Sequence, residues 1–166
     1  MSAKRRLIFL LLPVIAALVS AAAATADSPT IEQQTLHRSI PNFVTCPGFT
    51  VAGEFDVDRT VFTFYDSDGN PIRQVIHVHF VGTLTNTSTG KSIPDEGNQI
   101  VTNDLLTGSS TIDGRVRVTT VPGEGAILFQ VGRVVRDAAG NVVFFAGQND
   151  FLTRDFDDFC TYMAAP

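Results

Sequence analysis

His77 and His79 are the two residues whose spacing most directly suggests chemistry. Side chains two positions apart on a strand point to the same side of a sheet, so two imidazoles could share a metal ion. A metal site needs a third ligand, and His37 is the only other histidine. Arg73 and Thr83 would share the face of the pair, which indicates a solvated surface. The pattern therefore favours two surface histidines, with a metal site as the alternative.

Gln148, Asn149 and Asp150 form a polar cluster at the end of the last strand-like run. Such a cluster could line the mouth of a barrel, where small-molecule sites tend to lie. Phe80 and Phe129 would then supply apolar contacts to the ligand. The plainer alternative is that these polar side chains stop a strand.

Catalytic and cofactor motifs are incomplete in this chain. It has no Gly-x-Ser-x-Gly, and the fragment Gly90–Ser92 of a phosphate-binding loop lacks the preceding glycine. Asp66–Asn70 contains acidic residues but does not have the spacing of a calcium loop. We expect no cofactor. An isomerase or cyclase remains an alternative if side chains such as Asp104 and Arg133 point into a cavity, but the sequence leans away from an enzyme.

Cys46 and Cys160 are the only cysteines. An even pair in a small exported domain indicates a disulfide. The alternative, free thiols or metal ligands, lacks any Cys-x-x-Cys spacing.

Residues 1–26 have the features of a signal peptide: the basic start Lys4–Arg6, the apolar run Leu7–Val19 and the small residues Ala24–Ala26. We expect a secreted or cell-envelope protein, exported by the general secretory route; the arginine pair leaves the twin-arginine route open. Without the leader, the chain has nine basic and 17 acidic residues, which gives a net charge of −8. That charge argues against nucleic acid as a partner, and no second apolar run reaches the roughly 18 residues of a membrane span.

Period-two alternation from Phe49 onward predicts an all-β domain over residues 46–166, preceded by an irregular arm over 27–45. We expect about eight strands in meander order, near 49–57, 59–66, 72–86, 91–94, 99–106, 109–121, 126–136 and 142–148. Sequential hairpins of this number favour a closed antiparallel barrel, with a two-sheet β-sandwich as the alternative.

Turns and a short helix complete the expected domain. Asp66–Asn70 and Asp137–Asn141 share the form Asp-x-x-Gly-Asn, typical of hairpin turns with a glycine at positive φ. At the C-terminus Asp155 could cap a helix in which an apolar stripe falls on one side. The stripe comprises Phe156, Phe159, Cys160 and Met163.

The segment Pro122–Gly132 is similar to a glycine-bearing strand of dirigent proteins and allene-oxide-cyclase-like barrels. It places Gly123, Gly125 and Gly132 around an apolar strand. Ile127 and Gln130 depart from that family's pattern, which has an aromatic and a small residue there. The resemblance implies an eight-stranded barrel and transfers no catalytic residue. The mature chain also resembles uncharacterised secreted proteins of actinobacterial type.

Three functions follow as expectations. The first is an exported β-barrel that binds a small apolar molecule inside the barrel or at its mouth, since the expected inward faces are rich in Phe. The second is the barrel isomerase or cyclase. The third is a non-enzymatic extracellular or envelope interaction module, which could form homo-oligomers through strands that are apolar on both faces. Those strands are Thr60–Tyr65, Ala126–Val135 and Val142–Ala146.

Overall fold

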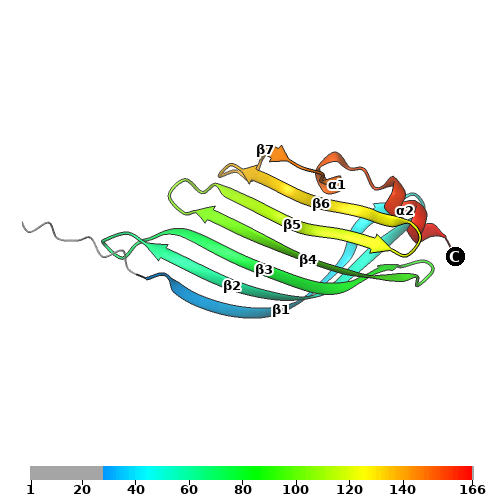
Figure 1. Cartoon of the computed structure of the whole chain (residues 1–166), viewed down its shortest axis with the longest axis horizontal. Helices are drawn as coiled ribbons and strands as arrows, with labels where there is room; N and C mark the ends of the chain where they lie inside the picture. The colour runs from blue at the N-terminus through cyan, green and yellow to red at the C-terminus, as the bar shows by residue number, and fades with distance from the viewer. Residues whose placement is uncertain (1–27, 166) are drawn as a thin grey trace, which may run out of the picture.

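The computed structural model describes residues 28–165, so the predicted signal peptide lies outside the described residues. The chain forms one antiparallel sheet of seven strands in sequential order, followed by two short helices (Figure 1). The strands are β1 (Thr30–Cys46), β2 (Phe49–Tyr65), β3 (Pro71–Asn86), β4 (Ser92–Asp104), β5 (Ser110–Val121), β6 (Gly125–Arg136) and β7 (Val142–Ala146); the helices are α1 (Asp150–Thr153) and α2 (Asp157–Ala164).

The prediction of a closed eight-stranded barrel is wrong, and so is the two-sheet alternative. A single sheet runs from β1 to β7 and its ends do not pair. Two pairs of predicted strands, 49–57 with 59–66 and 91–94 with 99–106, are continuous as β2 and β4. Residues 30–45, which belong to the predicted irregular arm over 27–45, lie in β1. The meander order is confirmed.

The regular ladder between β4 and β5 is short. Within residues 28–165 these two strands are paired only over Ile100–Asn103 and Ser110–Asp113. Beyond that ladder, the backbone of β5 comes so close to Gly97 that a Cβ there would collide with the Val116 carbonyl oxygen. Only glycine allows this approach, so Gly97 lets β5 stay packed against β4 where the ladder has ended.

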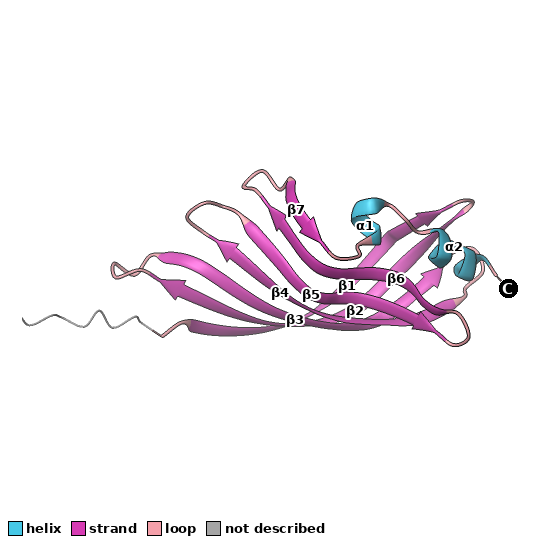
Figure 2. Ribbon diagram, turned by 45° about the horizontal axis from the view of Figure 1, so that its top comes forward, coloured by secondary structure: helices cyan, strands magenta, loops and turns pink. Residues whose placement is uncertain are grey.

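The main core lies at the end of the sheet where α1 and α2 lie (Figure 2). It is formed by strand residues such as Leu84 and Leu128 together with Phe159 and Met163 of α2, all four fully buried. The predicted stripe of α2 is therefore confirmed. Asp155 is not its cap, because the helix begins after Phe156 without a side-chain capping bond.

The predicted disulfide is confirmed. Cys46, at the end of β1, bonds to Cys160 of α2, with 5.5 Å between their Cα atoms. It ties one edge strand to the C-terminal segment that follows the other edge strand. This cross-link holds the rolled end together without closing the sheet.

The two Asp-x-x-Gly-Asn segments are hairpin turns, as predicted. The carboxylate of Asp66 accepts hydrogen bonds from the backbone N–H groups of Asp68 and Asn70, and Gly69 has φ +83°. Asp137 repeats the arrangement with Gly140 at φ +84°. Hydrogen bonds from the downstream asparagines lower the pKa of both carboxyls, so these side chains serve the turns.

We predict that replacing both cysteines with serine lowers the free energy of unfolding by about 2–5 kcal/mol, because the bond closes a long loop of the unfolded chain. The two residues are separated by 114 positions. Urea denaturation of the double variant and of the oxidised wild type measures the difference. Equal midpoints would show that the bond does not hold the rolled end together.

Candidate functional site

A buried ion pair bridges β4 and β5 beyond the end of their ladder. Arg117 Nε lies 2.6 Å from Asp95 Oδ2, and Thr119 Oγ1 donates to Asp95 Oδ1 at 2.7 Å. Asp95 and Arg117 are only 3% and 6% exposed. Side chains therefore connect the two strands where backbone pairing has stopped.

Four phenylalanine rings surround the Arg117 guanidinium. Its Cζ lies 4.5–5.5 Å from the ring centroids, which is cation–π distance. The rings belong to β1, β2, β3 and α1: Phe43, Phe55, Phe80 and Phe151. Burial lowers the pKa of Arg117, while Asp95 opposes the shift; an arginine nonetheless remains charged at neutral pH. The Arg117 cation of β5 thus contacts side chains from four other strands and one helix.

One depression, lined by residues of β5, β6 and α1, is small. The depression next to Phe151 and Gln130 measures about 60 Å³, whereas small-molecule sites measure roughly 300–1,000 Å³. We call Arg117 and the four phenylalanines around it the Arg117 box. Phe80, a predicted ligand contact, is one of these phenylalanines. Phe129 is half-buried, and its N–H donates to Asp150 Oδ2 at 2.6 Å. The geometry does not favour a ligand among these side chains.

The polar cluster at the end of β7 starts a helix. Asn149 is the N-cap of α1, and its side-chain oxygen accepts a hydrogen bond from Leu152 N–H at 3.1 Å. Asp150 is buried, which raises the pKa of its carboxyl. Gln148 is exposed. These contacts fit the plainer alternative, that the cluster stops a strand; a ligand-binding role for it stays a prediction.

The two residues considered for catalysis do not lie in the interior. Asp104 accepts hydrogen bonds from the N–H groups of Leu106 and Thr107 in the β4–β5 turn. Arg133 pairs with Asp113 at 2.6 Å, and its side chain is 59% exposed. An isomerase or cyclase that uses these two residues would need their side chains to point into a cavity, and they do not.

His77 and His79 share the outer face of the sheet, the face opposite the core, as predicted. The ring of His77 lies 5.2 Å from that of Phe62, and His79 Nδ1 lies 3.0 Å from Asn98 Oδ1. Among residues 28–165, no three His, Cys, Asp or Glu side chains are grouped so that they could hold a metal ion. No helix in that range is long and apolar enough to cross a membrane.

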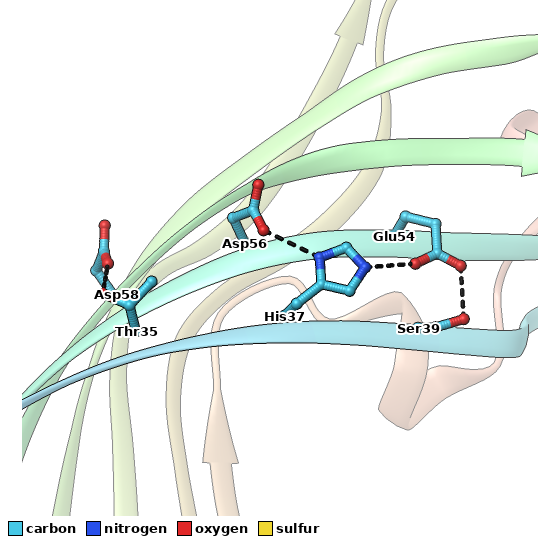
Figure 3. Close-up of polar contacts among 6 residues, drawn as sticks. All are labelled: Thr35, His37, Ser39, Glu54, Asp56 and Asp58. Carbon is cyan, nitrogen blue, oxygen red and sulfur yellow. Dashed lines mark hydrogen bonds and ion pairs between the residues drawn. The ribbon is translucent and has the colours of Figure 1, made fainter.

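A polar ladder on the outer face joins β1 to β2 (Figure 3). His37 lies between two carboxylates, 3.0 Å from Asp56 and 3.1 Å from Glu54, and Ser39 donates to the second oxygen of Glu54. The hydrogen bond to Asp56 raises the pKa of His37. Sequence reasoning missed this ladder because it treated the histidine's segment as irregular.

A shallow depression of about 390 Å³ continues this polar face across β1 to β4. It presents hydroxyl, amide, imidazole and carboxylate groups that could hydrogen-bond a polar ligand. The lining residues whose polar side chains are on the outer face are Gln33, Thr35, Asp58, Thr60, His77, His79 and Asn98.

Four consecutive exposed apolar side chains lie on β7, which is the last strand of the sheet. Val142, Val143, Phe144 and Phe145 are 36%, 61%, 51% and 47% exposed. We call Val142–Ala146 the apolar edge. Soluble proteins usually protect an edge strand with charges, proline or a covering element, and the apolar edge carries neither a charge nor a proline.

We predict that Arg117→Met lowers the free energy of unfolding by about 3–5 kcal/mol, because it leaves the buried Asp95 without a counter-ion. Arg133→Met is the matched control: its ion pair has the same 2.6 Å length but is exposed, and exposed pairs contribute little. Denaturant unfolding of both variants gives the comparison. Similar losses in the two would contradict the role assigned to the buried pair.

We also predict that the imidazole of His37 titrates above the ordinary histidine value of 6.5 and that Asp56→Asn lowers its pKa. The protonated ring is the form that pairs with the carboxylates. The pairing therefore stabilises the fold fully below the unfolded-state pKa, and this stabilisation disappears as the pH rises through the raised value. NMR titration of the ring protons measures the pKa; an unchanged value in the variant would contradict the pairing.

Comparisons with protein-family models, with curated proteins and with solved structures found no match to this chain.

Proposed function

We propose that this chain is a non-enzymatic extracellular interaction module that binds a protein partner by strand addition at the apolar edge. The observation that carries the proposal is that four consecutive apolar side chains, Val142–Phe145, are exposed on the last strand of an open sheet. An extended segment of a partner could pair with such an edge through main-chain hydrogen bonds, and its side chains would give specificity.

The backbone of the apolar edge supports this mode of binding. Val131 N–H donates to Gln148 O at 2.8 Å, so these two residues form a hydrogen-bonded pair between β6 and the end of β7. Hydrogen-bonded and non-hydrogen-bonded pairs alternate along an antiparallel ladder. The register continues unshifted to the pair Val135–Phe144, so Phe144 directs its N–H and C=O toward β6. Those of Phe145 point toward the free edge. Val143 has no partner on β6 and is the extra residue of a β-bulge.

The neighbouring turn extends the apolar surface. Leu106 and Leu105, between β4 and β5, are 76% and 41% exposed. Their turn approaches the β6–β7 turn, because a Cβ on Gly108 would lie 3.1 Å from that of Ala138. A partner strand on β7 could therefore also contact apolar side chains at this end of the sheet.

An interaction module also agrees with the rest of the chain. The disulfide suits an oxidising compartment outside the cytoplasm. The space of about 60 Å³ next to the buried helix cap leaves an apolar small molecule little room.

The test uses a fluorescein-labelled synthetic peptide of alternating threonine and valine as the extended strand. We expect saturable binding to the wild-type protein, read by fluorescence anisotropy, and loss of binding in Phe145→Pro. Proline removes an N–H that points to the free edge and leaves the bonds to β6 intact.

Phe145→Ala is the matched control, since it truncates the same side chain and keeps the N–H. It should bind the peptide at least about ten times more tightly than Phe145→Pro, because the difference includes a lost backbone hydrogen bond. Circular dichroism establishes that both variants are folded. Equal affinities of the two folded variants, or no saturable binding to the wild type, would overturn the proposal.

A further inference from the structure

We infer that the outer face of β1–β5 carries a binding site for a neutral saccharide chain, separate from the apolar edge and independent of the function proposed for it. Two adjoining depressions, of about 390 and 340 Å³, form this site and share His77, Val78 and Asn98 among their lining residues. Both volumes lie in the range of about 300–1,000 Å³ that is usual for small-molecule sites.

The strand register places the side chains of this site in two parallel rows across the sheet. Residues directly opposite each other on neighbouring strands share a face of the sheet. The first row consists of Thr35, Asp58, His79 and Asn98. The second row consists of Gln33, Thr60, His77, Ile100 and Asp113. We call these two rows the outer rows. Since neighbouring strands lie about 4.8 Å apart, the second row extends over about 19 Å, so it could contact several units of an extended ligand.

Hydrogen bonds within the first row hold the side chains that a ligand would meet. Thr35 Oγ1 donates to Asp58 Oδ1 at 2.7 Å (Figure 3). His79 Nδ1 lies 3.0 Å from Asn98 Oδ1. An amide oxygen can only accept, so Nδ1 donates, and Nε2 of the neutral ring is an acceptor. The row therefore offers Asp58 Oδ2 and His79 Nε2 as acceptors and Asn98 Nδ2 as a donor.

This mixture of acceptors and donors matches the chemistry of a sugar. Each hydroxyl group both donates and accepts hydrogen bonds, so neighbouring hydroxyls of one sugar could bond to the acceptors and to the donor of the same row. A sulfate group only accepts and an ammonium group only donates. Either of them would leave part of the row without a partner.

The charges near the outer rows are balanced, which favours a neutral ligand. Asp58 lines the larger depression, and Asp113 and Arg115 line the smaller one. Asp113 is paired with Arg133 at 2.6 Å. These four side chains comprise two acids and two bases, so a strongly charged ligand would meet charges of its own sign as well as the opposite sign.

An apolar flank lies next to the second row. In the neighbouring row, Ile31 lies opposite Phe62 and Phe62 lies opposite Val75. Ile31 is 62% exposed, and the ring of Phe62 lies 5.2 Å from that of His77. A sugar ring has C–H groups on its faces and hydroxyls at its edge. A saccharide could therefore pack its C–H groups on this flank while its hydroxyls bond to the outer rows.

The experiment is an NMR titration of the nitrogen-15-labelled protein with three neutral hexasaccharides: maltohexaose, cellohexaose and chitohexaose. We expect saturable changes in backbone amide shifts, concentrated in the outer rows, with at least one of the three. The dissociation constant should be about 1 mM, because the site is open and the chain has no tryptophan to stack on a sugar. Absence of saturable changes with all three, or changes centred on other residues, would overturn the inference.

The double variant His77→Ala, His79→Ala tests the outer rows directly. It should bind the saccharide at least about ten times more weakly, because two ring contacts are lost. His37→Ala is the matched control, since His37 lies on the same face but lines neither depression, and it should bind like the wild type. All three side chains are exposed, and the NMR spectra establish that the variants are folded. Equal affinities of the double variant and the control would overturn the site.

A charged saccharide tests the inferred class of ligand. Hexagalacturonate, which carries a carboxylate on each unit, should bind at least about three times more weakly than the best neutral hexasaccharide, because the chain as a whole is acidic. Tighter binding of hexagalacturonate than of all three neutral chains would overturn a neutral ligand.

Different variants separate this site from the apolar edge. Phe145→Pro should leave the saccharide-induced shifts unchanged, and the double histidine variant should still bind the extended peptide. Loss of saccharide binding in folded Phe145→Pro would move the saccharide to the apolar edge and overturn the inference. Failure of the peptide to bind the wild type would overturn strand addition, while saccharide shifts in the outer rows would still support this site.

Discussion

The pairing of Asp95 with Arg117 is the interaction on which the shape of this molecule depends. Backbone bonds hold β4 to β5 only near the β4–β5 turn, and farther along the two strands are joined by this ion pair and Thr119. Removing two charges from water is costly. The cost is offset here by a direct ion pair, a hydroxyl donor and four aromatic rings placed around the cation. The rings come from β1, β2, β3 and α1, so the same contact that joins two strands also gathers the rest of the core.

This arrangement separates the molecule into two ends with different properties. At the helix end, the Arg117 box, α2 and the disulfide hold the sheet in a rolled form whose interior is filled. At the other end, the sheet ends in β7 without a further strand to cover it. The buried polar side chains of Asp95, Arg117 and Thr119 stabilise the fold. The binding function that we propose therefore lies on the surface. The exposed apolar edge is the surface that departs most from what a solitary soluble protein would show.

Local patterns allowed much of the fold to be predicted. Alternation over β2, β3, β5 and β6, the two aspartate turns and the apolar stripe of α2 all depend on residues close in sequence. The barrel prediction failed because closure depends on whether β1 and β7 meet, which no local pattern encodes. The first strand was missed since Pro41 suggested a loop; an edge strand tolerates proline at an irregularity, and the register indeed shifts between Ile40 and Val44. The Arg117 box could not be predicted, because its residues become neighbours only through the register of the sheet.

Amide hydrogen exchange along β7 tests most directly whether this strand is a free edge that takes up a partner. In dilute solution we expect slow exchange at Phe144, whose N–H points to β6, and fast exchange at Phe145. When the extended peptide is added, the Phe145 amide should become protected as well. Protection of both amides in dilute protein without the peptide would mean that the edge is covered within one molecule, and it would contradict the account.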